Sequence, residues 1–271
     1  MIPNVLTIAG TDPTGGAGIQ ADLKSFSAMG AYGMSVITAV VAQNTCGVRS
    51  FESLEPSFVA DQIDAVFDDV RVDAVKIGMI ATAGIAEAIA DRLIHYEAKI
   101  VVLDPVMVAK SGDRLLLPEA IDVLRDRLIP LATLITPNLP EAGVLLDGDD
   151  PDTLEEMPEA AAGLLALGCE WALLKGGHLV SEESIDILAG PDGIIELRAP
   201  RITTRNTHGT GCTLAAAIAA LLPRFPMEES VRQAKAYLGE ALAHADRLDV
   251  GHGHGPVHHF HTWWPDEAAR S

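Results

Sequence analysis

Residues 5–42 read VLTIA-GTDPTGGAG-IQADLKSFSAM-GAYGMS-VITAVVA, and this stretch decides the fold. Val5–Ala9 is short and rich in β-branched residues, which predicts a strand. The segment Gly18–Met29 repeats its apolar residues at helical spacing and is followed by a glycine, which predicts a helix and its end. Val36–Ala42 is a continuous apolar run, typical of a strand that is covered on both faces. The stretch therefore predicts a strand, a helix and a second strand in one layered unit.

The same alternation continues along the chain. Further strands are predicted at Ala74–Ile77, Ile100–Leu103, Thr133–Ile135 and Trp171–Leu174, with a hairpin of Ile185–Leu188 and Ile194–Leu197. Further helices are predicted at Ser57–Val70, Gly84–His95, Glu119–Leu128, Glu141–Leu146, Glu159–Leu167, Thr213–Leu222 and Glu228–Asp246. We therefore predict an α/β fold with an open, mainly parallel sheet and helices on both faces, in a single domain over residues 1–271. A (β/α)₈ barrel is the alternative at this length, but the hairpin and the consecutive last helices favour an open sheet.

Composition and charge exclude several classes of partner. The chain has 271 residues, of which 48% are hydrophobic and 21% charged, and it carries a formal net charge of −19. Such a chain repels nucleic acid and anionic membrane surfaces, and its basic residues are scattered singly. Cys46, Cys169 and Cys212 are odd in number and far apart, which indicates a reducing compartment. The apolar run Leu214–Leu222 is too short to span a bilayer, and no secretory signal is evident, so we expect a cytoplasmic protein without nucleic-acid or membrane partners.

A second glycine-rich stretch is built to bind an anion. Gly209-Thr210-Gly211-Cys212 runs directly into a helix-favouring segment of small apolar residues. The first turn of a helix has backbone N–H groups without partners and a partial positive charge, and glycine lets an anion approach them closely. The same field favours a thiolate at Cys212. The alternative interpretation is an ordinary glycine-rich turn before a packed helix.

The glycine-rich loop Gly10–Gly18 follows the first predicted strand. It lacks the Lys-Ser/Thr ending of a Walker A motif, although its glycine spacing is similar to a dinucleotide fingerprint. That fingerprint expects a carboxylate about 20 residues later, at the end of the second strand. Gln43 and Asn44 stand there instead, which argues against a dinucleotide-dependent oxidoreductase. The amide of Gln43 suits the edge of an aminopyrimidine-like ring, and a capping amide is the alternative.

Polar and apolar side chains at later strand ends complete a candidate site. Met79, Val106 and Met107 offer an apolar wall for a planar ring, although methionines in such places are more often core filler. Asp104 ends a buried strand, where a carboxylate needs a partner or a metal. Asn138 and Glu141 share one side of a helical turn, where they suit a hydrated Mg²⁺. The alternative is that Glu141 is only a helix N-terminal carboxylate.

Lys175, followed by two glycines, is suited to clamp a phosphate group at the end of the next strand. An anion loop, a candidate magnesium pair, a lysine and a ring-sized pocket at one edge of a sheet are the parts that phosphoryl transfer needs. The residues therefore predict a kinase without a P-loop.

Eight segments carry a resemblance to a known family. They are Thr7–Asp12, Gly18–Lys24, Val41–Thr45, Lys76–Met79, Leu103–Met107, Thr136–Glu141, Leu174–His178 and Gly209–Cys212. Together they resemble the ribokinase-like superfamily and, within it, the hydroxymethylpyrimidine/phosphomethylpyrimidine kinases of thiamine biosynthesis. The resemblance implies two successive ATP-dependent phosphorylations with Mg²⁺, first of a hydroxymethyl group and then of the resulting monophosphate.

The resemblance also implies roles for individual residues. The pyrimidine pocket would consist of Gln43, Gly10, Asp22, Met79 and Val106. Asn138 and Glu141, with Asp104 beside them, would hold the metal, and Lys175 would contact the nucleotide phosphates. Gly209, Thr210 and Gly211 would form the anion hole. Cys212 stands where most sugar kinases of the superfamily have Asp, and we expect it to assist mainly the first phosphorylation.

Other functions and features stay open at this point. Pyridoxal kinase is the nearest alternative function, and a vitamin-binding module without catalysis is another. The family usually forms homodimers. The tail 251–271 holds five of the nine histidines, but its Gly and Pro residues give no fixed metal geometry, so we expect it to pack on the body of the protein, with Trp263-Trp264 as an anchor.

Overall fold

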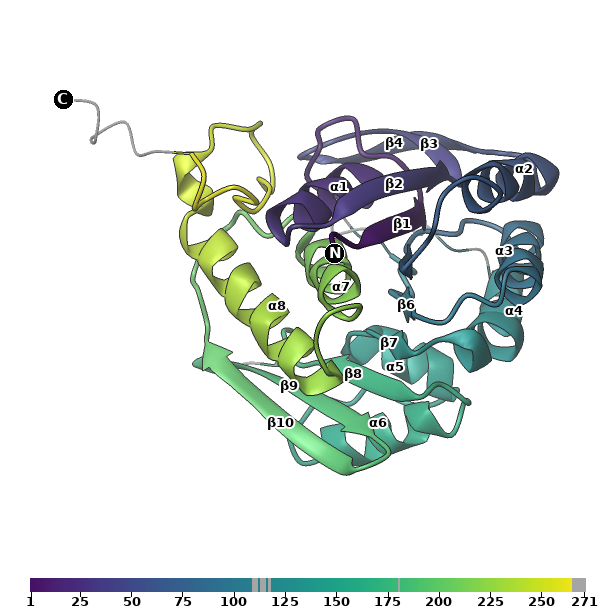
Figure 1. Ribbon diagram of the computed structural model, residues 1–271. Coiled ribbons are helices and arrows are strands. Elements are labelled where there is room, and N and C mark those ends of the chain that lie inside the picture. Colours follow the sequence, from purple (N-terminus) through teal and green to yellow (C-terminus); the bar gives the residue numbers. More distant parts are fainter. Residues whose placement is uncertain (109–111, 113–115, 117, 180, 265–271) are drawn as a thin grey trace.

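An eight-stranded sheet forms the centre of the computed structural model, which describes residues 1–108, 112, 116, 118–179 and 181–264 (Figure 1). Its strands lie in the order β10 (Gly193–Pro200), β9 (Glu183–Gly190), β8 (Trp171–Lys175), β7 (Leu134–Ile135), β6 (Val101–Leu103), β5 (Ala74–Ile77), β1 (Asn4–Ala9) and β2 (Tyr32–Ile37). β2, β1 and β5 to β8 are parallel, whereas β9 is antiparallel to both of its neighbours. The sheet ends at β10 and β2 and does not close, so the predicted open sheet is confirmed and the barrel alternative is wrong.

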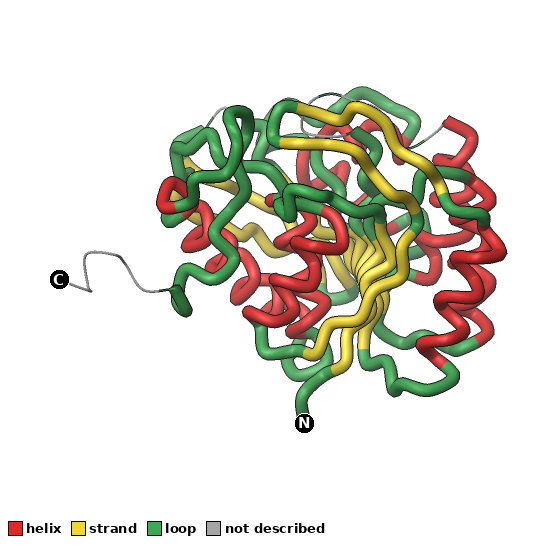
Figure 2. The backbone as a smooth tube through the Cα atoms, turned by 90° about the horizontal axis from the view of Figure 1, so that it is seen from above, coloured by secondary structure: helices red, strands yellow, loops and turns green. Residues whose placement is uncertain are grey.

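Helices cover both faces of the sheet, as Figure 2 shows. On one face lie α1 (Gly18–Ala28), α7 (Thr210–Leu221) and α8 (Met227–Ala243). On the other lie α2 (Pro56–Phe67), α3 (Ala83–His95), α4 (Pro118–Val123), α5 (Leu139–Leu146) and α6 (Met157–Leu165). Successive strand residues point to opposite faces, so Val5 packs with the first set while Leu6 packs with the second. The predicted layers are confirmed.

Most predicted elements agree with the structure to within three residues at each end. One of two exceptions is the helix predicted at Glu119–Leu128, whose α-helical part ends at Val123. It continues as a π-helical turn, Leu124–Leu128, and a 3₁₀ turn, Ile129–Leu131. A second 3₁₀ turn, Ala245–Arg247, follows α8.

The single strand predicted at Val36–Ala42 is wrong, because the chain changes sheets at Thr38. β2 ends at Ile37, and the chain continues as β3 (Ala39–Asn44), which pairs with β4 (Gly47–Ser53) in a separate antiparallel sheet. Thr38 fixes the change of direction by donating its hydroxyl to the carbonyl of Met79 at 2.6 Å. The apolar run has no signal for this break, and β4 was not predicted. We call residues 39–53 the flap.

The order of the strands creates a switch point at the carboxyl end of β1. From β1 the chain passes to β2 on one side, and after the flap and α2 it returns to β5 on the other side. Ligands in open α/β sheets bind beyond the carboxyl ends of the strands at such a switch point. The loop Gly10–Ala17 after β1 and the segment that begins at Gly78 after β5 meet at this place.

The described part of the C-terminal tail, residues 251–264, runs back over the body beside the loop that follows β1 (Figure 1). Trp264 contacts the rings of His258 and Phe260 within the tail, and both Trp263 and Trp264 are more than half exposed. Residues 265–271 of the predicted tail lie outside the described residues. Among the helices that the structure describes, none is both long enough and apolar enough to cross a bilayer.

Candidate active site

The anion loop opens helix α7. Gly209 caps the helix in the left-handed region, with φ of 78°, and its carbonyl accepts a hydrogen bond from Thr213 N at 2.8 Å. Within the described chain, the backbone N–H groups of Gly211 and Cys212 donate no hydrogen bond. A Cβ atom on Gly209 would lie 1.8 Å from the carbonyl oxygen of Gly16, so only glycine fits here. The loop therefore has the geometry of an anion hole, with unpaired donors at a helix start.

Asp12 joins the two glycine-rich loops of the site. Its buried carboxylate accepts hydrogen bonds from the backbone N–H groups of Gly16 and Ala17 at 3.0 and 2.8 Å. His208 donates to the same oxygen at 2.8 Å, and Thr14 donates to the other. Burial favours the neutral acid, but the hydrogen bonds from His208 and Thr14 prevail and hold the pKa of Asp12 well below its usual range. No role was predicted for Asp12 or His208 from the sequence. An acid and a histidine that each lie beside a glycine-rich loop were the pattern that could have indicated a link between the two loops.

Lys175 and Asp104 form an ion pair beneath the anion loop. Lys175 Nζ lies 3.0 Å from Asp104 Oδ1 and 3.9 Å from Glu141 Oε2. Thr136 donates its hydroxyl to Asp104 at 3.0 Å. A Cβ atom on Gly211 would lie 3.4 Å from Lys175 Nζ, so the lysine and the unpaired N–H groups face the same small region. Burial alone would raise the pKa of Asp104, but the nearby lysines outweigh it and keep this carboxylate ionised.

Asn138 and Glu141 form a capping box at the start of α5. Asn138 Oδ1 accepts from Glu141 N at 2.9 Å, and Glu141 Oε2 accepts from Asn138 N at 2.8 Å. Burial raises the pKa of Glu141 to about 7, against the opposing charge of Lys175. Glu141 therefore does act as a helix N-terminal carboxylate, which was the alternative interpretation of the sequence. Its second carboxylate oxygen takes no part in the capping box.

These residues fit a magnesium ion that is shared with a polyphosphate. Glu141 and Asp104 supply oxygen donors, and Mg²⁺ is usually held by one or two carboxylates together with waters and substrate phosphates. In the described chain no group of three or more His, Cys, Asp or Glu side chains is placed to hold a metal alone. The donor set therefore suits a metal that arrives with a nucleotide, rather than a permanently caged one.

A second buried ion pair joins β5 to α1. Lys76 Nζ, fully buried on β5, lies 3.0 Å from Asp22 Oδ2, which also accepts from Thr7 at 2.6 Å. Asp22 Oδ1 is buried without a hydrogen-bond partner among the described residues. Although burial would lower the pKa of Lys76, the charge of Asp22 outweighs it and raises this pKa above its ordinary value. The sequence analysis did not single out Lys76, because a lysine inside a central strand gives no sign of a buried partner from a distant helix.

Cys212 is a thiol, contrary to the thiolate expected from its place at a helix start. It is only partly exposed, and burial raises the pKa of its thiol to about 11, although the positive charge of Lys76 acts in the opposite direction. Desolvation here outweighs the favourable field of the helix.

An apolar pocket wall lies between the switch point and the flap. A Cβ atom on Gly10 would approach Met79 Sδ to 2.9 Å, so glycine permits this contact. Met79 packs with Val41 of the flap, and Val106 lies against the same cluster. Met107 belongs to the main core instead. The structure thus brings together three residues of the predicted pocket, Gly10, Met79 and Val106.

Gln43 lies on a different element from the one that the sequence predicted. It lies on β3 of the flap, beyond a β-bulge at Ala42/Gln43, and not at the end of a strand of the main sheet. Bulges commonly re-aim a side chain beside an active site. The Gln43 amide is partly buried and forms no side-chain hydrogen bond in the described part of the chain, so its donors and acceptor are available to a ligand.

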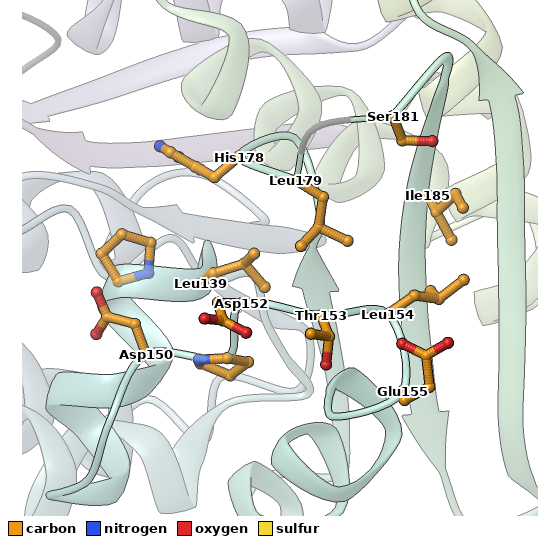
Figure 3. A pocket seen from close by; sticks show the side chains of 12 residues that line it. Leu139, Asp150, Asp152, Thr153, Leu154, Glu155, His178, Leu179, Ser181 and Ile185 are labelled. Atoms are coloured by element: carbon orange, nitrogen blue, oxygen red, sulfur yellow. The ribbon is translucent and has the colours of Figure 1, made fainter.

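A separate cleft of about 610 Å³ opens beside the start of α5 and the loop after β8 (Figure 3). Its lining includes Leu139 and Leu179, with Asp150, Asp152 and Glu155 around them. Three carboxylates make this cleft unsuited to a polyphosphate. The phosphate-binding features converge instead on Lys175 and the anion loop.

Comparisons with known proteins identify the family of this chain. Residues 12–258 match the family described as phosphomethylpyrimidine kinase. The hydroxymethylpyrimidine/phosphomethylpyrimidine kinase of Escherichia coli (strain K12) is 61% identical over 96% of this chain and 98% of its own. The enzyme of the same name from Rhizobium meliloti (strain 1021) is 52% identical over the same shares.

Solved structures of two kinds resemble the fold. An ADP complex of Bacillus subtilis pyridoxal kinase has a TM-score of 0.87 at 36% identity and covers 96% of this chain and 98% of its own. A phosphomethylpyrimidine kinase from Clostridium difficile 630 has a TM-score of 0.79 at 44% identity, over 89% and 99%. The family match over most of the length and the high identities agree, and this chain belongs to the phosphomethylpyrimidine kinase family.

Proposed function

We propose that this protein transfers the γ-phosphoryl group of ATP to 4-amino-5-hydroxymethyl-2-methylpyrimidine and then to its monophosphate, giving the diphosphate for thiamine biosynthesis. One observation carries the proposal. The unpaired N–H groups of Gly211 and Cys212 face the same region as Lys175, a place suited to a phosphoryl group in transfer. The family membership supports the pyrimidine as acceptor.

In this proposal, the flap and the switch point hold the acceptor. Met79 and Val106 contact the faces of the pyrimidine ring, and the Gln43 amide bonds to its edge. The unpartnered oxygen of Asp22 accepts a hydrogen bond from the substrate. The ring is thereby oriented so that its hydroxymethyl group points at the anion loop.

The nucleotide phosphates bind on the opposite side of that loop. Lys175 neutralises phosphate charge, and the loop N–H groups stabilise the charge that develops on the transferred group. Asp104 and Glu141, with Asn138 at the same helix start, would hold Mg²⁺, which supplies positive charge to the phosphate oxygens. The ion pair with Asp104 keeps Lys175 oriented toward the phosphate oxygens.

Cys212 has a narrower role in this proposal. Its thiol pKa of about 11 makes it a weak source of thiolate at neutral pH. Phosphoryl transfer passes through a loose transition state with late proton removal, so a weak base suffices for the hydroxymethyl group. In the second reaction the acceptor is a phosphate oxygen, which needs no base. We therefore assign Cys212 mainly to the first phosphorylation.

The direct test is to incubate the purified protein with ATP, Mg²⁺ and the hydroxymethylpyrimidine and to identify the products by mass. Monophosphate followed by diphosphate is the expected result. Monophosphate alone would contradict the second reaction, and the absence of ATP consumption would favour a vitamin-binding module without catalysis.

Pyridoxal is the second candidate acceptor, because a pyridoxal kinase shares this fold over nearly the whole chain. Competition between the pyrimidine and pyridoxal for one enzyme distinguishes them, and we expect the pyrimidine to have the higher kcat/KM. We also propose a cytoplasmic location and a homodimer. Exposed apolar side chains such as Tyr32 and Val40 support the dimer, and sedimentation velocity would test it.

A further inference from the structure

The C-terminal tail contacts three separate parts of the candidate site within nine residues, Gly251–His259. We propose that this segment, which we call the strap, is a positioning device that holds the flap against the anion loop and the start of α7. The inference rests on the proposed function for its kinetic consequences, but its structural part stands without it.

The first contact is with the tip of the flap. The N–H of Gly253 donates to Thr45 Oγ1 at 3.1 Å, and the N–H of His254 donates to the Thr45 carbonyl at 2.8 Å. A Cβ atom on Gly253 would lie 2.0 Å from that carbonyl oxygen, and one on Gly251 would lie 2.2 Å from Thr45 Oγ1. Two glycines of the strap are therefore needed for its fit against the flap.

The second contact is with the anion loop. His208 N donates to the carbonyl of Gly255 at 3.0 Å, and His208 forms a parallel bridge with Pro256. His254 Nδ1 lies 3.1 Å from the carbonyl oxygen of Arg205. His208 is also the histidine that donates to Asp12, so the strap supports the junction of both glycine-rich loops.

The third contact is with the first turn of α7. His259 Nε2 and Thr213 Oγ1 are 3.0 Å apart, and both side chains are buried. Thr213 directly follows Cys212 in the chain. Burial lowers the pKa of His259 to about 3, so this ring is neutral and acts as a fixed hydrogen-bond partner. Tyr237 of α8 donates to the His259 carbonyl at 2.9 Å, which fastens this end of the strap to the body.

The flap needs such support because of its size. An isolated two-stranded sheet is marginally stable in water, and the flap has only two strands. Hydrogen bonds of Thr38 hold its base, and the strap holds its tip, only two residues from Gln43. A loosened tip would let Gln43 move away from the pyrimidine while the nucleotide side of the site stays in place.

The test is the variant Gly253→Ala, which places a methyl group against the flap carbonyl. The matched control is Gly239→Ala on α8, where an added Cβ meets nothing within 4 Å. We expect Gly253→Ala to raise the KM for the pyrimidine about tenfold or more, with the KM for ATP within about twofold of the original value. The milder variant Thr45→Val replaces the hydroxyl with a methyl group and should act in the same direction, whereas Thr45→Ser keeps the hydroxyl and should keep the original value.

Hydrogen exchange of the flap amides is the readout that needs no substrate. We expect faster exchange at residues 43–47 in Gly253→Ala and unchanged exchange in Gly239→Ala. If the original protein phosphorylates no pyrimidine, the proposed function fails, and the exchange result still decides the strap. Unchanged exchange, or equal increases in the two KM values, would overturn the strap proposal.

Discussion

The carboxylate of Asp12 holds the two glycine-rich loops of the site together, and replacing it by an amide gives a quantitative test. Asp12 accepts five hydrogen bonds: two from Thr14 on one oxygen, and one each from Gly16, Ala17 and His208 on the other. In Asp12→Asn the size is unchanged, but one oxygen becomes an NH₂ group that cannot accept.

The magnitude follows from the better of the two amide orientations. With its oxygen toward Gly16, Ala17 and His208, the amide turns NH₂ toward Thr14, whose hydroxyl can rotate and accept, but whose backbone N–H loses its partner. An unsatisfied buried donor costs about 1–3 kcal/mol. The three remaining bonds lose their charged acceptor, which adds about 1 kcal/mol in total. We expect Asp12→Asn to lower the free energy of unfolding by about 2–4 kcal/mol.

Urea unfolding at neutral pH measures this loss, and Asp192→Asn in the exposed turn between β9 and β10 is the matched control. The control should change the free energy of unfolding by less than about 0.5 kcal/mol. Because the folded protein depresses the pKa of Asp12, its stabilisation is present above the unfolded pKa of about 4 and is lost as pH falls further. The difference between the original protein and Asp12→Asn should therefore shrink below about pH 4. A loss under about 0.5 kcal/mol at neutral pH, or one that does not depend on pH, would show that the Asp12 carboxylate does not hold the two loops together.

Three further predictions concern the reaction. Gln43→Ala should weaken pyrimidine binding at least about tenfold and leave ATP binding unchanged, because the amide lies on the flap and away from Lys175; calorimetric titrations with each ligand measure this, and equal losses would contradict it. Cys212→Ala should slow the first phosphorylation and spare the second; equal losses in the separated half-reactions, followed by product mass, would show that division of labour to be wrong. Apparent Mg²⁺ affinity should fall as pH decreases through about 7, because burial raises the pKa of Glu141 to about 7 and protonation removes a ligand charge; Glu141→Gln should abolish that step, and a persisting step would assign it elsewhere.

The alternation of strands and helices was predictable because each element carries its own period and its own end signals. The strand at Ala74–Ile77 agrees in both bounds, and the helix predicted at Gly18–Met29 ends one residue earlier, at Ala28. The flap was not predictable in this way. Both halves of Val36–Ala42 are apolar, and the break at Thr38 depends on a hydrogen bond to Met79, which is distant in sequence.

The residues of the candidate site also differ in how far they could be predicted from the local sequence. Lys175, Asn138 and the anion loop could be proposed from the sequence because each lies at the end of a predicted strand or at the start of a predicted helix. Lys76, Asp12 and His208 were missed, since their meaning lies in partners from other segments. The pKa of Cys212 was misjudged for a related reason, because the helix start is local and visible in sequence, whereas burial is set by the whole fold.

The charges around α7 give a physical reason for a metal-bound nucleotide. Lys76 is paired with Asp22, whose pKa burial raises against the charge of Lys76, and Lys175 is paired with Asp104, which is ionised. Glu141 adds a negative charge only above its pKa of about 7. Among the residues that the structure describes, the two lysines beside α7 are therefore already paired, and the anion loop contributes only partial charges. In the proposed reaction, a divalent cation held against Asp104 and Glu141 would supply further positive charge to the phosphates and would also favour ionisation of Glu141.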